Sequence, residues 1–333
     1  MRKLGAVLLT VSFLAGAPWG ETIRHAAAQS PIDQRLPVYR PADKLQGTIH
    51  IVGSDTMAQV AAVWAEGFHK FHPNVKVKVE IKNSAAAVEA VAKKTADFGL
   101  LSREIQDDEV AAFKTAAGHD PAVVIPALQA VAIFVHKDNP IESLTIDQVD
   151  AIFSASLKRG AKNTVATWGD VGVTGEWAKK PIETHIRSEE TGTQDYIEKV
   201  ILHHGKFRED AKKDESNLDL VKAIAKETTA IGFADSMYEL PGVKAVPITI
   251  EKGHPALSVD EVSPDGHGYP LVRPAHLVMN RDPKAALSAV DAEFIKYVFS
   301  QTGQDDVVKI GFAPIINKTA QTSLGAAGLS TIK

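Results

Sequence analysis

The chain has no cysteine and few aromatic residues, which make up only 6% of its 333 positions. The absence of cysteine excludes disulfide bonds, a thiol nucleophile and a cysteine-ligated metal. No basic excess is present either, since the formal net charge is −4, so we expect no nucleic-acid partner. With 44% hydrophobic and 23% charged residues, the composition is typical of a globular protein with one large core or two moderate ones.

Long hydrophobic runs are absent except near the N-terminus. Residues 1–3 are a basic start, and residues 4–17 form an apolar run. The small residues Ala26 and Ala28 follow. This order is typical of a secretory signal peptide. We therefore predict a signal peptide over residues 1–28, with cleavage after Ala28.

An N-terminal anchor helix is the alternative interpretation of this run. The run is short for a membrane span, however, and it ends at Pro18. No cysteine follows it to carry a lipid anchor. We therefore expect a soluble mature protein that works in the periplasm, or that is released from the cell.

Beyond a proline-rich N-terminal lead over residues 29–46, strand and helix patterns alternate. The first group has strands at 47–54, 74–82 and 96–102 and helices at 56–73 and 83–94. Further along the chain, we predict strands at 130–137, 181–187, 229–236 and 243–250, an extended segment at 269–280, and helices at 145–156, 191–202 and 292–312. This order predicts parallel strands joined by right-handed crossovers.

Three strand-to-helix turns carry clustered hydroxyl, amide or carboxylate side chains: VGSDTM (52–57), IKNSAAA (81–87) and IRSEETGTQ (186–194). In any one turn these residues could be ordinary helix N-caps. Parallel strands, however, bring such turns together at their carboxyl ends, where helix N-termini carry partial positive charge. Small anions bind in that geometry.

Arg187 strengthens the anion interpretation of the third turn. It precedes Thr191 by four residues, and Gly192 and Thr193 follow. A guanidinium presents a planar fork of donors that suits a tetrahedral oxyanion. The sequence therefore predicts an arginine, two hydroxyls and a helix N-terminus as part of an oxyanion site.

Other kinds of active or metal site find little support. The twelve histidines are scattered, and no H-E-x-x-H, G-x-S-x-G or Walker lysine motif occurs. We therefore predict no catalytic residues, no metal site and no cofactor, and we do not expect an enzyme.

Several segments resemble, in the same order, the periplasmic phosphate-binding protein of the high-affinity phosphate ABC transporter. They lie within residues 47–315 and are GSDTM with the following helix and strand (53–80), NSAAAVEAVAKKTADFGLLSRE (83–104), the strand and helix of 127–156, IRSEETGTQDY (186–196) and YPLVRPAHLVMN (269–280).

The resemblance implies an α/β fold of the two-lobed periplasmic binding protein type (type II), with a mixed sheet in each lobe and a two-strand hinge. Lobe 1 would comprise residues 47–131 plus 271–333, and lobe 2 residues 132–270. Such a protein captures inorganic phosphate between its lobes and delivers it to an ABC permease in the cytoplasmic membrane. A monomer is expected.

The resemblance also implies a set of phosphate-binding residues that are the turn residues singled out above, with the end of the third strand added. They are Ser54, Asp55, Thr56, Ser84, Ser102 and Arg103 on lobe 1, and Arg187, Thr191, Gly192 and Thr193 on lobe 2.

Two turns depart from the family pattern. Thr191 stands where the family has serine, which keeps the hydroxyl, whereas residues 85–87 are alanines in a turn that is usually rich in glycine. Alanine permits fewer backbone conformations and fills more space. Another oxyanion, such as sulfate or molybdate, is therefore an alternative ligand. An exported sensor or adhesion-like protein that kept the fold and lost the ligand is a further alternative.

Asp55 has two possible roles. Phosphate near neutral pH carries a proton and sulfate does not, so an acceptor facing the ligand favours phosphate. Arg103 cannot accept a hydrogen bond, but Asp55 can. Asp55 is thus the candidate discriminator, with a helix N-cap as its equally weighted alternative. Glu189 and Glu190 are weaker candidates for the same role.

Overall fold

The computed structural model describes residues 32–188, 191–251, 253–263 and 268–329. The predicted signal peptide lies outside these residues. The described chain divides into two compact units, with unit 1 formed by residues 32–128 and 274–329 and unit 2 by residues 129–273. Within the part of the chain that is described, no helix has both the length and the hydropathy to span a membrane.

Unit 1 contains a five-stranded sheet with helices on both faces. Its strands are β1 (Gly47–Ser54), β2 (Val75–Lys82), β3 (Phe98–Leu101), β4 (Ala122–Val124) and β13 (His276–Met279). Its helices are the 3₁₀ turn η1 (Asp55–Met57), α1 (Ala58–Phe71), α2 (Ser84–Ala92), α3 (Asp107–Ala117), α7 (Ala289–Val298), α8 (Gln301–Lys309) and α9 (Asn317–Ala326).

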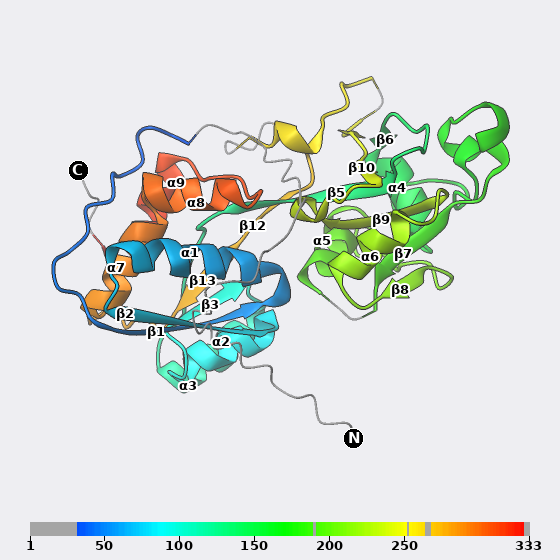
Figure 1. The fold of residues 1–333 in the computed structure, drawn as a ribbon. Coiled ribbons are helices and arrows are strands. Elements are labelled where there is room, and N and C mark those ends of the chain that lie inside the picture. Colours follow the sequence, from blue (N-terminus) through cyan, green and yellow to red (C-terminus); the bar gives the residue numbers. More distant parts are fainter. Residues whose placement is uncertain (1–31, 189–190, 252, 264–267, 330–333) are drawn as a thin grey trace. The chain divides into compact units, whose positions relative to one another are not determined.

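The sheet of unit 1 is mixed, with the strand order β2-β1-β3-β13-β4. β1 pairs in parallel with both β2 and β3, whereas β13 runs antiparallel to β3 and β4. The predicted strand–helix–strand–helix–strand pattern of the first hundred residues is therefore confirmed. α1 covers one face of this sheet, and α2 and α3 cover the other (Figure 1).

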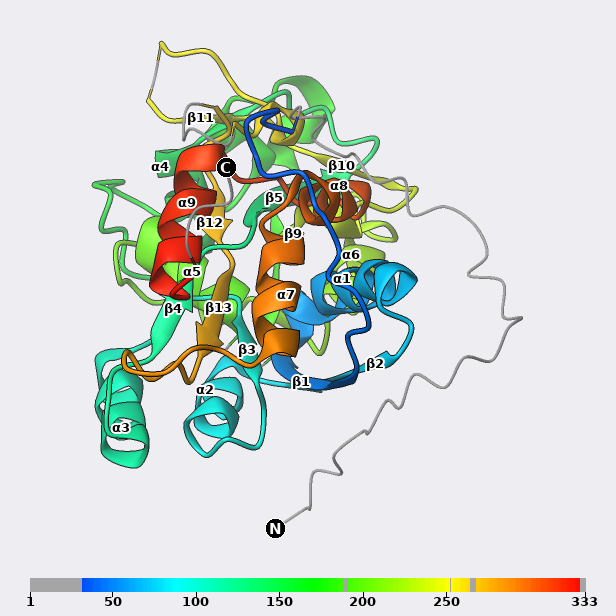
Figure 2. The ribbon, with the colours of Figure 1, turned by 90° about the vertical axis from the view of Figure 1, so that its left-hand side faces the viewer.

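Apolar side chains fill both faces of this sheet. On the face of α2 and α3, Val52 and Leu101 pack with Val88 and Phe113. The ring of Phe294, from α7, lies against Phe98 of β3 and Phe68 of α1, with 5.3 Å between ring centroids in each case. α7 contacts β1 and α1, and α9 contacts β4 (Figure 2).

The predicted single helix over residues 292–312 was wrong, because two helices occupy this region. α7 ends at Val298, and Ser300 begins α8 by accepting a hydrogen bond from the Gly303 N–H at 3.2 Å. A serine side chain that competes for backbone N–H groups favours a helix start over a helix interior. The chain therefore turns there, although the apolar periodicity continues.

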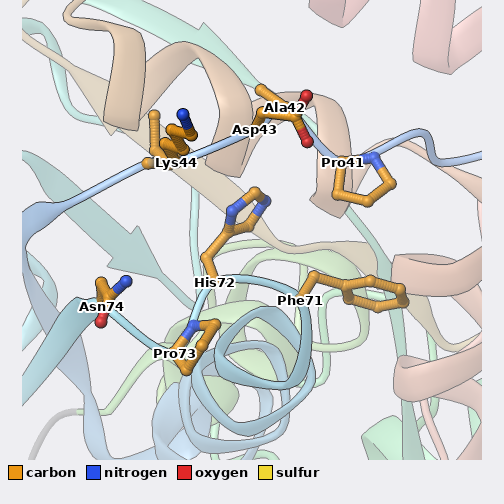
Figure 3. A pocket seen from close by; sticks show the side chains of 9 residues that line it. Pro41, Ala42, Asp43, Lys44, Phe71, His72, Pro73 and Asn74 are labelled. Atoms are coloured by element: carbon orange, nitrogen blue, oxygen red, sulfur yellow. The ribbon is translucent and has the colours of Figure 1, made fainter.

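The N-terminal segment, residues 32–46, runs along unit 1 and contacts its C-terminal helices. The Asp33 carboxylate accepts from the Asn317 N–H at the start of α9 at 2.9 Å, and Tyr39 Oη lies 2.6 Å from His72 Nε2. A pocket of about 170 Å³ lies between residues 41–45 and residues 71–74. Figure 3 shows His72 in this pocket, between the N-terminal segment and the turn at Pro73.

Unit 2 contains a second mixed sheet and a two-stranded pair. Its strands are β5 (Leu128–His136, whose first residue belongs to unit 1), β6 (Leu144–Thr145), β7 (Glu183–Arg187), β8 (Lys212–Asp214), β9 (Ala230–Asp235), β10 (Val243–Ala245), β11 (Ile248–Thr249) and β12 (Val272–Pro274, whose last residue belongs to unit 1). Its helices are α4 (Ile146–Phe153), α5 (Gly192–Val200) and α6 (Asn217–Ile224), with 3₁₀ turns η2 (Trp168–Val171), η3 (Gly175–Lys179), η4 (Ser236–Tyr238) and η5 (Val259–Glu261).

The main sheet of unit 2 has the order β10-β5-β9-β7-β8, and β12 pairs with β5. β7 is parallel to β8 and β9, so these strands end at one edge. Gly232 of β9 lets α6 approach, because a Cβ there would lie 2.9 Å from side-chain atoms of Leu220 and Ile224. The mixed α/β fold predicted for both parts of the chain is confirmed.

Two details of unit 2 differ from the sequence expectation. The single strand predicted over residues 243–250 is two short strands, β10 and β11, which belong to different sheets. Pro247 lies between them, and proline has no N–H to continue a ladder. In addition, α6 was not predicted from the sequence, although Ser216 is an N-cap that accepts from the Asp219 N–H at 3.0 Å.

Candidate anion-binding site

In unit 1, the candidate residues lie at the carboxyl ends of three parallel strands. The register pairs Ser54 with Lys82 and Gly53 with Leu100, so β1, β2 and β3 end at the same edge of the sheet. The side chains that follow these ends are buried hydroxyls, namely Ser54, Thr56, Ser84 and Ser102, each no more than 6% exposed. A sheet edge lined by buried hydroxyls and helix starts suits a small anion.

The first turn follows β1 directly. Ser54 Oγ and Thr56 Oγ1 lie 3.2 Å apart, so one hydroxyl can orient the other. Asp55 is exposed, and its carboxylate accepts the Thr56 N–H at 2.9 Å. Asp55 is not itself an N-cap, because Ser54 holds that position and Asp55 begins the turn η1. Its carboxylate nevertheless binds a first-turn N–H, as a capping side chain would.

The second turn shows how alanines replace the glycines expected there. Asn83 is the N-cap of α2 and accepts from the Ala86 N–H at 2.8 Å. Residues 84–87 are already helical, so their backbone needs no special freedom. Ala85 is exposed and Ala87 packs in the core. The buried Ser84 hydroxyl thus stands at the first position of a regular helix.

Ser102 and Arg103 follow β3 and have different surroundings. Ser102 is 1% exposed, and its Oγ has no hydrogen-bond partner within the described residues. Arg103 donates from both Nη atoms to the Glu109 carboxylate of α3, at 2.7 and 2.8 Å. Glu109 also accepts the Gln106 N–H at the start of α3. These contacts attach Arg103 to the N-terminus of α3.

In unit 2, Arg187 is the last residue of β7 and is 5% exposed. Its Nη1 donates to Asn217 Oδ1 at 3.2 Å, and its Nη2 donates to the Glu215 carbonyl at 2.9 Å. Glu215 lies between β8 and α6, Asn217 is the first residue of α6, and both contacts are made to neutral acceptors. These two hydrogen bonds hold the guanidinium in a fixed orientation.

The Thr191–Thr193 segment forms the start of α5. Thr191 is the N-cap and accepts from the Gln194 N–H at 3.3 Å, and Gly192 is the first helical residue. Thr193 is fully buried. The predicted helix and its polar start are thus present after β7. Glu189 and Glu190, the weaker candidates for the discriminating acceptor, lie outside the described residues.

The structure adds four buried side chains that sequence reasoning missed: Gln129, Asn217, Asp235 and Arg273. Asp235 is the last residue of β9, and Arg273 Nη2 donates to its Oδ1 at 2.8 Å. Asn217 Nδ2 donates to the other oxygen, Oδ2, at 3.3 Å. The available indication in the sequence was a charged residue within each of two strands, namely Asp235 at the end of β9 and Arg273 in the middle of β12.

Each unit therefore carries its own set of groups suited to an oxyanion. Unit 1 offers buried hydroxyls and the N-termini of η1 and α2, and unit 2 offers Arg187 and the N-terminus of α5. Helix N-termini stabilise negative charge, and a guanidinium adds charge-assisted hydrogen bonds. Among the described residues, no group of three or more His, Asp or Glu side chains is placed to hold a metal ion.

The pocket beside His72 is a separate feature of unit 1. It is lined by Leu45 and Asn74, which lie just before β1 and β2 begin. It is therefore at the amino ends of these strands, opposite the edge that carries Ser54 and Ser84. The sheet topology thus separates this pocket from the candidate site.

Comparison with known proteins gives related sequences and folds. A family model described as a PBP superfamily domain matches residues 40–302. The phosphate-binding protein PstS of Pseudomonas aeruginosa is 36% identical over 327 residues, which cover 98% of this chain and 100% of that protein. The protein SphX of Synechococcus elongatus is 24% identical over 300 residues, 88% of this chain and 86% of that protein.

Solved structures share the fold. The crystal structure of an ABC-type phosphate transport receptor from Vibrio cholerae superimposes with a TM-score of 0.60. It is 23% identical and covers 80% of this chain and 100% of that one. At this identity, the similarity supports the architecture of the two units rather than any particular ligand.

Proposed function

This chain belongs to the PBP superfamily and, within it, to the family of the phosphate-binding protein PstS, and on that basis we propose that it captures inorganic phosphate for an ABC transporter. The family is one of substrate-binding transport proteins and not of enzymes. We propose further that the protein acts in the periplasm as a monomer and delivers phosphate to a permease in the cytoplasmic membrane.

The observation that carries the proposal is the end of β7. There, the buried guanidinium of Arg187 is followed by the polar start of α5 at Thr191–Thr193. Such a combination binds a tetrahedral oxyanion through a bidentate donor and helix N–H groups. The buried hydroxyls Ser54, Ser84 and Ser102 supply a second set of neutral hydrogen-bonding groups.

We propose that these ten residues are the phosphate site: Ser54, Asp55, Thr56, Ser84, Ser102, Arg103, Arg187, Thr191, Gly192 and Thr193. In this scheme the two units are the two lobes, both contribute to one anion, and binding draws them together. No bond of the ligand is made or broken. Arg103 would act by its positive charge and by fixing the start of α3, since its Nη atoms already bind Glu109.

Isothermal titration of the mature chain with phosphate, arsenate, sulfate and molybdate tests the ligand. We expect phosphate to bind with the highest affinity and Arg187→Ala to weaken it strongly. Tighter binding of sulfate or molybdate would replace the proposed ligand, and no binding of any of the four would refute the proposal. Small-angle scattering with and without saturating phosphate tests closure, for which we expect a smaller radius of gyration in the bound form.

A further inference from the structure

Arg273 is an almost completely buried arginine of β12, 3% exposed, that binds three side chains of unit 2. Its Nε donates to Gln129 Oε1 at 2.9 Å. Its Nη2 donates to Thr193 Oγ1 and to Asp235 Oδ1, both at 2.8 Å. One guanidinium therefore connects β5, β9, β12 and the first turn of α5.

The hydroxyl of Thr193 has a defined orientation because of these contacts. It accepts from Arg273 and donates its single proton toward Asp235 Oδ1, 3.3 Å away. A hydroxyl has one proton and two lone pairs, so only one lone pair is left for any other donor. Thr193 Oγ1 is thus a fixed part of the network, and it fixes the start of α5 in turn.

A second contact attaches α5 to β12 one helical turn later. Tyr196 donates its hydroxyl proton to the Val272 carbonyl at 3.1 Å, and its ring centroid lies 5.8 Å from Arg273 Cζ. Residues at positions i and i+3 share one face of a helix. The face of α5 that carries Thr193 and Tyr196 is therefore held against β12.

The same network reaches Arg187 through Asn217. Asn217 accepts from Arg187 Nη1 and donates to Asp235 Oδ2. Asp235 is fully buried, and its Oδ1 forms an ion pair with Arg273 Nη2 at 2.8 Å. Loss of this ion pair would leave more negative charge near a bound anion, which would disfavour that anion.

We propose that Arg273 is a positioning residue for anion capture. It neutralises Asp235 and fixes Thr193, so that the N-terminal turn of α5 and Arg187 hold their places before the anion arrives. A site that is ordered in advance loses less conformational freedom on binding. The inference rests on the proposed function for its ligand, and on the geometry of unit 2 for the role of Arg273.

A direct contact between Arg273 and the anion is the competing explanation. Nη1 of Arg273 is buried and makes no hydrogen bond within the described residues. A direct contact and a positioning role both predict weaker binding when Arg273 is changed. They differ in whether that loss depends on the hydroxyl of Thr193.

A double-mutant cycle with phosphate titration separates the two roles. Arg273→Lys keeps the charge but cannot bind Gln129, Asp235 and Thr193 together, because its donors sit on one nitrogen. We expect Kd to rise about ten- to hundred-fold, as for the loss of one hydrogen bond to a charged group. Thr193→Val should give a similar rise in Kd.

The double variant Arg273→Lys/Thr193→Val decides the outcome. If Arg273 acts by positioning Thr193, the Kd of the double variant should be close to that of Thr193→Val alone. Wild-type affinity of Arg273→Lys, or a loss that adds in full to that of Thr193→Val, would overturn the inference. Arg208→Gln is the control, because Arg208 is another arginine of unit 2 but binds Asp210 and the carbonyls of Ile152 and Val165. It should leave Kd unchanged.

Two further measurements keep the proposal testable if a variant does not fold or if the unaltered protein binds no phosphate. If Arg273→Lys does not fold, Arg273→Gln/Asp235→Asn removes both buried charges and should restore folding. Hydrogen exchange of the ligand-free protein should be faster at residues 192–195 in Arg273→Lys than in the Arg208→Gln control. If the unaltered protein binds no phosphate, the proposed function fails. The exchange result still decides the positioning role, and equal exchange in both variants would refute it.

Discussion

Nδ1 of His185 lies 2.8 Å from Oδ2 of Asp214, which joins the neighbouring strands β7 and β8 by a side-chain contact. On its other side, Nε2 lies 3.1 Å from Glu183 Oε1, and Lys212 pairs with the same carboxylate. The imidazole is 4% exposed. Burial alone would lower the pKa of His185, but the two carboxylates outweigh burial and raise it above the ordinary value.

His185→Gln should therefore reduce stability in a pH-dependent way. A raised folded-state pKa contributes stability that is fully present below the unfolded pKa of about 6.5 and is lost as the pH rises through the folded value. We expect the variant to lose about 1–3 kcal/mol of unfolding free energy at pH 6 and less at pH 9. Urea unfolding at both pH values measures this loss.

His254→Gln is the control for this experiment, because His254 is exposed. His254→Gln should leave the unfolding free energy unchanged at both pH 6 and pH 9. An equal loss in His185→Gln at pH 6 and pH 9 would contradict a protonated His185 between its two carboxylates.

Arg187→Ala should abolish most of the phosphate affinity. The guanidinium is buried and is oriented by hydrogen bonds to Asn217 Oδ1 and to the Glu215 carbonyl. Loss of its charge-assisted bonds should cost about 3 kcal/mol of binding free energy, roughly a hundred-fold in Kd. Arg187→Lys should recover only part, because lysine lacks the planar fork. An unchanged Kd in Arg187→Ala would remove this residue from the site.

Ser102→Ala should change binding and stability in different directions. Its buried Oγ has no partner in the described part of the chain, and a buried polar group without a partner is unfavourable. Alanine should therefore leave the unfolding free energy equal or raise it by up to about 1 kcal/mol. Phosphate affinity should fall by about ten-fold if the hydroxyl binds the anion.

Ser300→Ala is the matched control for Ser102→Ala. Ser300 is also buried, but its hydroxyl caps α8 and donates to the Tyr297 carbonyl at 2.7 Å. Its removal should cost about 1 kcal/mol of stability and leave Kd unchanged. A wild-type Kd in Ser102→Ala would exclude Ser102 from the site.

Asp55→Asn should narrow the preference for phosphate over sulfate. A carboxylate that faces the anion tolerates a phosphate proton between them but repels sulfate, whereas an amide can also donate. The change in the ratio of the two affinities should correspond to about 1.5–3 kcal/mol. If Asp55 only accepts the hydrogen bond of the Thr56 N–H, asparagine should replace it with little effect. Titrations would then give the same ratio of phosphate to sulfate affinity as in the unaltered protein.

The first three strands and the first two helices of unit 1 were predictable because they follow each other with clear periodicity, whereas α3, β4 and α9 were not predicted. Residues 47–54 were predicted as a strand from their β-branched residues, and residues 74–82 from apolar residues that alternate with charged ones. The structure has strands at both places. The break at Ser300 was missed because the apolar spacing on either side continues in helical phase. Only the serine cap distinguishes two helices from one at that point.

The candidate residues could be found in the sequence because each one follows a predicted strand or begins a predicted helix. At such positions, the residue types themselves indicate a binding or capping role. Arg273 and Asp235 could not be found in this way, since they lie 38 residues apart in the chain. They meet only because β5 pairs with both β9 and β12. Thr193 was predicted as a ligand, but its bonds to that pair depend on the same tertiary pairing.

The proposed site would bring phosphate to groups that are buried in unit 2, such as Arg187 at the end of β7. A ligand that binds the folded protein and not the unfolded chain stabilises the fold. The phosphate-free protein is then the form that opens more often. Proteases that cleave opened chains remove such a form first. Under the proposed function, phosphate supply would therefore govern how long each copy of the protein survives, as well as how much ligand it carries.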